Sequence, residues 1–420
     1  MSMKFTKKVC VLSNGCLDNR IDSARIVEFL KQNGYLVTDL VREADVILFN
    51  ACGLTGHQED VARRMIREIE RLKKSGAELI LGGCLTKIAG EFWQGATFGV
   101  DDDLAILDHV FKARVLIQDV HANRPVRKIY SCRDLSCKKS LLMKAISPEI
   151  VLRKLSNYVR LPRSLECESL FLSRLARRRK KSMFRKFPVA VPRWCVKVST
   201  GCLNACSFCA VRLSRGKLRS KPVDTVLQEF EEGRQAGFSQ FLLTGTDIGA
   251  YGRDQDTSLV VLLTELVRMS GEYRLDLRNL QPRFLIEMLP KLQEALRSGK
   301  ICRIISAAQS GNDRILRVMN RGYVLKDLKD VFNRLKGEFP EICLHTQVIV
   351  GFPGESEEEF QDTVRLLNEV EFDLVEVYPY RPRSGTKAAE IHEQIPEEVI
   401  KKRFLSLVKQ CDQAVGFPLW

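Results

Sequence analysis

The sequence predicts an α/β protein with two units, an N-terminal parallel-sheet α/β domain and a partial (β/α)6 barrel. Hydrophobic residues make up 45% of the 420 residues and charged residues 28%, which is typical of a globular protein with a sizeable core. Short apolar strands alternate with amphipathic helices in the first hundred residues. A second alternating series begins at Trp194, after a strongly basic stretch.

The first unit contains three predicted strands separated by two predicted helices. The strands are 8–13, 45–50 and 78–81, and the helices are 22–33 and 58–74. Apolar residues in the longer helix recur every three or four positions, which indicates one buried face. Strand–helix–strand spacing of this kind predicts a parallel sheet with right-handed crossovers.

The second unit contains six predicted strands with helices between them. The strands are 195–199, 240–244, 275–279, 303–307, 345–350 and 374–378. The helices include 223–236, 259–269, 313–320 and 357–369. Six such units predict a partial (β/α)6 barrel, in which chemistry lies on the loops that follow the carboxyl ends of the strands.

We therefore expect four segments along the chain. They are an N-terminal domain (1–118), a basic insert or linker (119–193), the barrel (194–405) and a C-terminal tail (406–420). From His121 to Lys197 there are 21 Lys and Arg but only 4 Asp and Glu, a net charge of +17 on 77 residues. The rest of the chain carries 46 basic and 48 acidic residues, a net charge of −2. Such a concentration of positive charge predicts a polyanionic partner, and RNA is the first candidate. The alternative is a solvated basic linker, in which a short run such as Arg177–Lys181 serves solubility or targeting.

No apolar run reaches the length of about 18 residues that a membrane-spanning helix needs. The basic N-terminus is also not followed by a signal-type apolar segment. We expect a cytoplasmic protein with no membrane partner. Structural disulfides are rare in that reducing compartment, so some of the 14 cysteines are expected to bind a metal or a cluster.

The strongest signal is Cys202-Leu-Asn-Ala-Cys206-Ser-Phe-Cys209, just after the first barrel strand. Three thiolates on one loop suit three irons of a 4Fe–4S cluster, which leaves the fourth iron free of protein ligands. That open iron can bind S-adenosylmethionine and pass an electron to its sulfonium, which yields a 5′-deoxyadenosyl radical. A zinc knuckle would need a fourth nearby ligand, and a thioredoxin-like CxxC would not need Cys202.

Further short motifs follow one another along both units. They are NGCLDN (14–19), NACG (50–53), GGCL (82–85), TGTDIGAYG (244–252), QSGND (309–313), MNR (319–321), GFPGE (351–355) and YRPRSGT (380–386). Together with the cysteine loop, they resemble the methylthiotransferases of the radical S-adenosylmethionine superfamily over about 1–115 and 194–405. The resemblance implies an iron–sulfur enzyme that replaces an unactivated C–H by C–S–CH3. One S-adenosylmethionine would supply the methyl group and a second the radical.

Three cysteines of the first unit, Cys16, Cys52 and Cys84, lie 36 and 32 residues apart, each just beyond a predicted strand. Because the carboxyl ends of parallel strands share one edge of a sheet, these cysteines can converge there. The alternative is that they are three small buried hydrophobic residues. The resemblance assigns them to a second 4Fe–4S cluster, where sulfur is bound or supplied.

Five further residues could contact S-adenosylmethionine or the substrate. The resemblance places Phe208 near the adenine and the loop of Gly245 and Asp247 near the methionyl amine. Asp247 could accept a charge-assisted hydrogen bond from that amine, or it could cap a helix or turn. Gln309 and Ser310 follow the fourth barrel strand and could reach the cofactor or the substrate.

The segment Gly249–Asp254 looks most like the family branch that methylthiolates threonylcarbamoyl-adenosine next to the tRNA anticodon. The basic stretch fits tRNA as the partner, since an exposed loop base can be read without opening a duplex. Isopentenyl-adenosine in tRNA, a protein or peptide residue, and a non-catalytic RNA-binding iron–sulfur protein remain as alternatives. The resemblance also implies a sulfur donor and an electron donor such as flavodoxin or ferredoxin.

The chain departs from the family pattern in several places. Gln347 stands where Asp is frequent, and no β-rich sequence corresponding to the family's C-terminal TRAM domain follows Gln410, so we expect other surfaces to bind the substrate. Three insert cysteines could bind a metal together with His121, although their spacing matches no known pattern. These three are Cys132, Cys137 and Cys167. The cysteines in or beside strands are expected to pack in the core.

Overall fold

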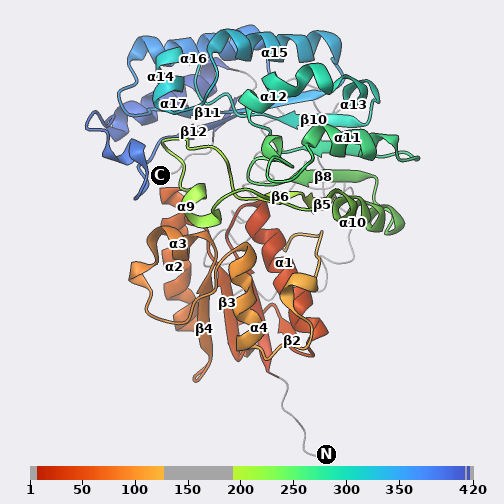
Figure 1. Cartoon of the computed structure of the whole chain (residues 1–420). Coiled ribbons are helices and arrows are strands. Elements are labelled where there is room, and N and C mark those ends of the chain that lie inside the picture. Colours follow the sequence, from red (N-terminus) through yellow and green to blue (C-terminus); the bar gives the residue numbers. More distant parts are fainter. Residues whose placement is uncertain (1–6, 127–192, 412–413, 417–420) are drawn as a thin grey trace, which may run out of the picture.

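The computed structural model describes residues 7–126, 193–411 and 414–416. Figure 1 shows an N-terminal domain in red and orange below a larger domain coloured green to blue. Most of the basic insert, including the run Arg177–Lys181 and the three insert cysteines, lies outside the described residues. No helix among the residues described is both long and apolar enough to cross a membrane.

The N-terminal domain is a four-stranded sheet in the order β2-β1-β3-β4, with every neighbouring pair parallel. Its strands are β1 (Lys8–Ser13), β2 (Leu36–Thr38), β3 (Val46–Asn50) and β4 (Glu78–Gly82). One face packs against α1 (Leu17–Gln32) and α4 (Ile106–Val110), and the other against α2 (Gly56–Leu72) and α3 (Cys84–Ala89). Alternate strand residues face opposite helices, which explains why β3 is buried throughout and apolar up to its last residue, Asn50.

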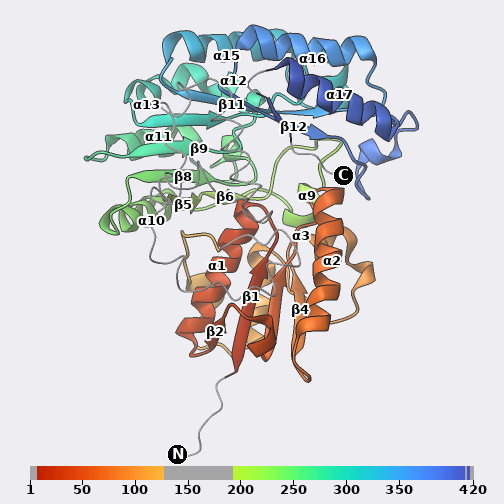
Figure 2. The ribbon, with the colours of Figure 1, turned by 180° about the vertical axis from the view of Figure 1, so that it is seen from behind.

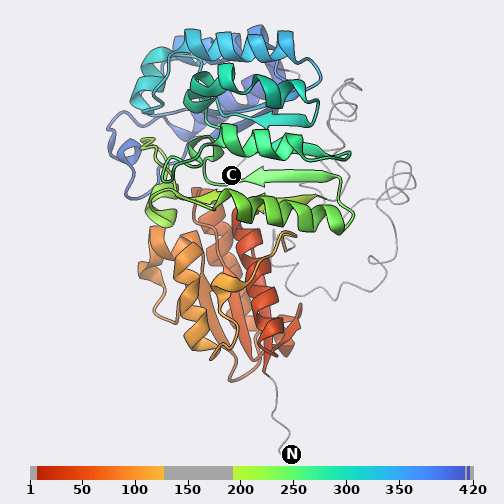
Figure 3. The ribbon, with the colours of Figure 1, turned by 45° about the vertical axis from the view of Figure 1, so that its right-hand side comes forward.

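The larger domain is a curved parallel sheet in the order β13-β12-β11-β10-β9-β8-β5. Its strands are β5 (Trp194–Lys197), β8 (Gln240–Thr244), β9 (Arg274–Leu277), β10 (Ile301–Ile305), β11 (Cys343–Val350), β12 (Leu374–Pro379) and β13 (Ala414–Gly416). The helices of this domain are α9 (Val211–Arg215), α10 (Val223–Gln235), α11 (Leu259–Arg268), α12 (Pro282–Met288), α13 (Gln293–Arg297), α14 (Asp313–Val318), α15 (Leu325–Glu338), α16 (Glu357–Val370) and α17 (Glu397–Gln410). Figures 2 and 3 show helices lying along the outer face of this sheet, where one continuous apolar core forms. The short strands β6 (Ser199–Thr200) and β7 (Arg219–Ser220) pair antiparallel beside it.

All nine strands predicted from the sequence are present, so the α/β fold class is confirmed. The sequence missed β2, which has only three residues, none of them buried, and therefore no detectable pattern. It also missed β13, which follows Gln410 and pairs parallel with β12. The segment expected to be only a tail thus extends the barrel sheet, and the boundary expected at 405 falls within α17.

The carboxyl ends of the N-terminal strands point toward the barrel domain (Figure 1). Leu17 and Ile21 of α1 pack against Cys195 of β5 and Leu242 of β8. The flanking residues Val196 and Leu243 instead belong to the core beneath the outer helices. Because side chains alternate along a strand, α1 covers the inner face of the first two barrel strands. The cysteine edge of the N-terminal sheet therefore lies beside the open edge of the barrel.

Candidate active site

The loop Cys202–Cys209 connects β6 to α9 at the carboxyl end of the first barrel strands (Figure 1). Gly201 enters it with φ of +71°, and a Cβ there would lie 1.8 Å from the carbonyl oxygen of Lys217. Only glycine can therefore occupy this position without displacing backbone. Inside the loop the amide of Cys209 donates to the carbonyl of Cys206 over 3.1 Å. A tight turn thus gathers the three cysteines.

Polar donors surround two of these sulfurs. Cys202 Sγ accepts from the backbone and the side-chain amide of Asn204, each at 3.3 Å. Cys206 Sγ accepts from Arg321 Nη1 at 3.2 Å and from Gln281 Nε2 at 3.7 Å. Hydrogen bonds and a positive charge at sulfur stabilise thiolates and tune a bound cluster.

Burial raises the pKa of Cys202 above its ordinary value and that of Cys209 to about 12. Without a cation these two thiols would stay protonated at neutral pH, whereas bound iron would supply the positive charge that favours thiolates. The loop therefore fits an iron–sulfur cluster. Among the described residues no three His, Cys, Asp or Glu side chains could hold a single metal ion. That finding is compatible with a cluster, because each thiolate then binds a different iron.

Asp247 supports this loop from the end of β8. Its Oδ1 accepts from the amides of Gly249 (3.0 Å) and Gln281 (3.3 Å), and its Oδ2 accepts from Asn204 Nδ2 at 2.6 Å. Asp247 thus caps a short 3-10 turn and holds the residue that donates to Cys202. The neighbouring carbonyl of Gly245 accepts from Asn279 Nδ2 at 2.7 Å. Of the two roles expected for Asp247, the structure supplies a cap, while contact with a methionyl amine stays a proposal.

The other predicted contact residues lie in different surroundings. Phe208 packs edge-on against Phe352, with ring centroids 6.5 Å apart, in a small apolar cluster at the mouth of the barrel. Gln309 adopts φ of +69°, and its buried Oε1 has no hydrogen-bond partner among the described residues. The hydroxyl of Ser310 lies 3.4 Å from that of Thr363 on α16. Ser310 is therefore directed at an outer helix.

Cys16, Cys52 and Cys84 follow β1, β3 and β4, the three neighbouring strands of the N-terminal sheet. The amide of Cys52 donates to Asn14 Oδ1 at 2.9 Å, which ties the second cysteine loop to the first. The amide of Ala51 donates to the carbonyl of Gly82 at 2.7 Å, and the carbonyl of Ala51 accepts from the amide of Leu85 at 3.2 Å. These two bonds tie the second cysteine loop to the third. The predicted convergence of the three cysteine loops is thus observed.

Asn19 lies between two of these cysteines. Its Oδ1 is 3.9 Å from Cys16 Sγ and 3.5 Å from Cys84 Sγ. Its Nδ2 donates to Asn50 Oδ1 at 3.0 Å, which fixes the orientation of the amide. Burial raises the pKa of Cys16. As in the barrel loop, bound iron would offset this effect, so these residues also fit a cluster.

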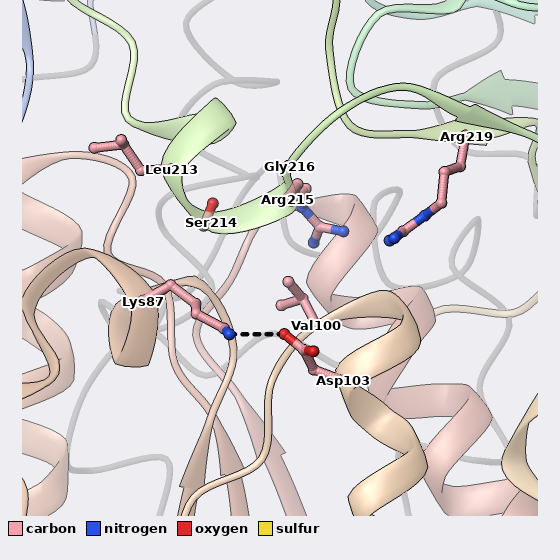
Figure 4. Close-up of a pocket in the computed structure, with 8 residues that line it drawn as sticks. All are labelled: Lys87, Val100, Asp103, Leu213, Ser214, Arg215, Gly216 and Arg219. Atoms are coloured by element: carbon pink, nitrogen blue, oxygen red, sulfur yellow. Dashed lines mark ion pairs between the residues drawn. The ribbon is translucent and has the colours of Figure 1, made fainter. Parts of the chain in front are cut away.

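The two cysteine sites approach each other at the domain interface. α3, which begins with Cys84, packs against α9, which begins two residues after Cys209. A pocket of about 190 Å³ opens between these helices and η3 (Asp101–Ala105). Figure 4 shows Lys87 and Asp103 paired across it at 2.9 Å, with Arg215 and Arg219 above them. The pocket thus borders both sites.

Comparison with known proteins agrees with this two-part site. Residues 196–367 match the Radical SAM superfamily, and residues 8–101 match a family described as Uncharacterized protein family UPF0004. A protein of Archaeoglobus fulgidus, named "Probable threonylcarbamoyladenosine tRNA methylthiotransferase", is 30% identical over 398 residues, covering 94% of this chain and 81% of that relative. The chain belongs to the radical S-adenosylmethionine methylthiotransferase family. The two matched families imply S-adenosylmethionine and iron–sulfur clusters as cofactors of this methylthiotransferase.

Relatives of this methylthiotransferase carry two different substrate names. A "tRNA-2-methylthio-N(6)-dimethylallyladenosine synthase" of Acetivibrio thermocellus is 29% identical, covering 96% of this chain and 76% of that one. Sequence identity therefore does not choose between the two adenosines. The radical S-adenosylmethionine methyltransferase TsrM of Kitasatospora setae matches the structure with a TM-score of 0.57 at 15% identity, over 92% of this chain and 74% of that chain. This likeness shows a shared fold.

Several polar residues of the methylthiotransferase site were not singled out by the sequence. Asn19 and Arg321 lie inside motifs that carry the family resemblance, NGCLDN and MNR, so the motifs held the signal. Arg215 lies six residues after Cys209 in no such motif, and only the fold brings it to the other cysteine site. His121, a candidate metal ligand, instead lies 3.3 Å from the buried Glu229.

Proposed function

We propose that this methylthiotransferase acts on threonylcarbamoyl-adenosine next to the tRNA anticodon, converting C–H to C–S–CH3 with two 4Fe–4S clusters. Cys202, Cys206 and Cys209 would hold the cluster that binds S-adenosylmethionine. That cofactor pair supplies a radical able to abstract hydrogen from an unactivated carbon. The protein's part is positional, because Asn204, Gln281 and Arg321 already point donors at the sulfurs.

Cys16, Cys52 and Cys84 would hold the second cluster, at which the incoming sulfur is bound. Support for this role is the convergence of their three loops and the packing of α3 on α9. The helices that follow Cys84 and Cys209, α3 and α9, pack together, so a substrate at the barrel mouth could face both sites. Phe208 packs in the apolar cluster at that mouth, and Gly245 and Gln309 follow β8 and β10; these three would line the cofactor side.

The observation that carries the choice of substrate is a group of polar side chains inside the barrel, which we call the polar wall. It consists of Arg278, His345, Gln347, Glu376 and Tyr378. Glu376 of β12 accepts from Gln347 Nε2 at 2.6 Å and from Tyr378 at 2.8 Å, and His345 Nε2 lies 3.4 Å away. Burial opposes its ionisation and also lowers the pKa of His345, but the interaction with His345, the charge of Arg278 and the hydrogen bond from Tyr378 bring the pKa of Glu376 to about 2. Glu376 is therefore ionised and already hydrogen-bonded.

Arg278 follows β9 directly and its charge acts on Glu376, His345 and Cys195, which lie on three other strands. Within the described residues its guanidinium makes no hydrogen bond and no ion pair within 4.0 Å. A half-buried guanidinium with free donors matches a carboxylate, and the threonyl group of threonylcarbamoyl-adenosine carries one. A dimethylallyl group would instead bury apolar surface against the guanidinium of Arg278 and leave it without a partner. The wall therefore favours the threonyl branch.

The test is product analysis with Arg278→Gln in the full chain. We expect wild type to methylthiolate tRNA carrying threonylcarbamoyl-adenosine, and the variant to do so about 10- to 100-fold more slowly, which is the loss of one charged hydrogen-bonding pair. Arg274→Gln is the matched control, since Arg274 opens the same strand but is exposed and contacts Gly299. Mass spectrometry of tRNA nucleosides measures the product.

Three outcomes would contradict this substrate assignment. The first is a methylthio product on isopentenyl-adenosine, and the second is an unchanged rate in Arg278→Gln. The third is slower cleavage of S-adenosylmethionine by that variant without tRNA. Arg278 would then bind the carboxylate of the cofactor, and the wall would no longer support a threonyl substrate.

The basic stretch from His121 to Lys197 is our proposed contact with tRNA. Phosphate contacts release counterions, so affinity should fall steeply with salt. Neutralising the five residues Arg177–Lys181 should flatten the plot of log affinity against log salt by up to about 4–5 units. Equal slopes for wild type and variant would make this run a solvated face. An electron donor such as flavodoxin or ferredoxin and a separate sulfur donor complete the proposed partners.

A further inference from the structure

Two buried arginines of the barrel domain contact groups that lie beside the cysteines of the N-terminal domain. The first is Arg215, the last residue of α9, which is only 4% exposed. Its Nη2 donates to Asn19 Oδ1 at 2.6 Å and lies 3.2 Å from Asp22 Oδ2. One guanidinium thus joins a carboxylate of α1 to the amide that lies beside Cys16 and Cys84.

The second is Arg383, in the loop after β12, which is 7% exposed. Its Nη1 lies 2.8 Å from Glu59 Oε2 on α2, and its Nη2 donates to the carbonyl of Gly53. Gly53 directly follows Cys52, and a Cβ on it would lie 2.9 Å from the Cα of Leu85. Arg383 therefore holds the second cysteine loop where it is packed against the third.

The two arginines use the same arrangement at opposite sides of the N-terminal sheet. Each pairs with a carboxylate on a helix, Asp22 on α1 or Glu59 on α2, and also donates to a group beside a cysteine, Asn19 Oδ1 or the carbonyl of Gly53. The planar guanidinium is suited to such double contacts because its donors are held in a rigid fork. Both donors belong to the barrel domain, so the N-terminal domain alone does not supply these contacts.

We propose that Arg215 and Arg383 are positioning residues that complete the second cluster site across the domain interface. This rests on the proposed ligation of that cluster by Cys16, Cys52 and Cys84. The site is then assembled only when the barrel packs on the N-terminal sheet. Because Arg215 lies six residues after Cys209, the same contact also ties the position of one cysteine site to the other.

The test uses a background in which Cys202, Cys206 and Cys209 are all Ala, so that bound iron reports the N-terminal site alone. Arg215→Gln and Arg383→Gln are made in that full chain, reconstituted with iron and sulfide, and analysed for iron content and for the electron paramagnetic resonance spectrum after reduction. Arg381→Gln is the matched control. Arg381 lies in the same loop as Arg383 and pairs with Asp60 across the interface at 3.7 Å, but reaches no cysteine loop.

We expect the background protein to bind about four irons per chain, as one 4Fe–4S cluster requires. Each Gln variant should bind at most about half of that, or give a shifted spectrum, while Arg381→Gln matches the background. Arg215→Lys and Arg383→Lys should restore iron but not the spectrum, since Lys keeps the charge without the fork. If a Gln variant does not fold, the spectrum of the corresponding Lys variant decides.

Two results would overturn the positioning role. One is that both arginine variants keep the iron content and the spectrum of the background protein. The other is an equal loss in Arg381→Gln, which would mean that any weakening of the interface has the same effect. A background protein that binds no iron would instead remove the proposed second cluster itself, and the positioning role with it.

Discussion

The two cysteine sites are built in different ways. The three barrel cysteines lie within eight residues on one loop, and their closest polar partners belong to the barrel itself. The three N-terminal cysteines come from three strands, and the contacts around them include Arg215 and Arg383 of the other domain. The first site is therefore encoded by a short sequence, whereas the second depends on topology and on domain packing.

The largest expected effect is the loss of the local site. Replacing Cys202, Cys206 and Cys209 by Ala should remove the iron of one cluster and reduce reductive cleavage of S-adenosylmethionine to background, because each thiolate holds one iron. Measured 5′-deoxyadenosine is the readout. Cleavage that persists in the triple variant would rule out this loop as the radical site.

The second expected effect separates the sites. Replacing Cys16, Cys52 and Cys84 by Ala should roughly halve bound iron and abolish methylthio product, while cleavage of S-adenosylmethionine continues. The reason is that these three cysteines follow strands of the N-terminal sheet, whereas the radical loop belongs to the barrel domain. Iron content, 5′-deoxyadenosine and modified nucleosides are measured on one preparation. Methylthio product from this variant would show that the three cysteines are only structural.

The smallest expected effect is electronic and confined to the barrel site. Arg321→Gln removes a buried positive charge 3.2 Å from Cys206 Sγ. The potential of that cluster should fall by about 60 mV, which corresponds to roughly tenfold in a one-electron equilibrium. Redox titration followed by paramagnetic resonance measures it, with Arg317→Gln on the exposed side of α14 as control. An equal shift in the control, or no shift in Arg321→Gln, would contradict this role.

The sequence predicted the fold well where hydrophobic periodicity is long enough to detect. β8 was predicted with its observed limits, and β1 likewise, because each has an uninterrupted apolar run flanked by polar residues, Val9–Leu12 in β1 and Phe241–Leu243 in β8. β2 and β13 have three residues each, too few for a pattern to stand out. Their pairing depends on neighbouring strands, which the local sequence does not describe.

Site residues were likewise predictable where the signal is local in the sequence or follows from strand order. The barrel cysteine loop was predicted from its spacing together with its place after the first strand of a β/α series. The convergence of the loops of Cys16, Cys52 and Cys84 followed from the rule that parallel strands share an edge. For Asp247 the sequence left two roles open, contact with the methionyl amine or a helix or turn cap, and the structure shows a cap. Contacts such as Arg215 to Asn19 join residues 196 positions apart, so no local pattern could reveal them.

The pairing of Asp22 with both Lys197 (2.5 Å) and Arg215 (3.2 Å) has a consequence for the modularity of the protein. All three side chains are buried, so exchanging the N-terminal domain for one without this carboxylate would remove the anion from both ion pairs, and breaking a buried pair costs about 3–5 kcal/mol. A chimera between relatives would therefore need to carry the carboxylate and its two cations together. The domains are separate in the sequence but share one buried group of charges.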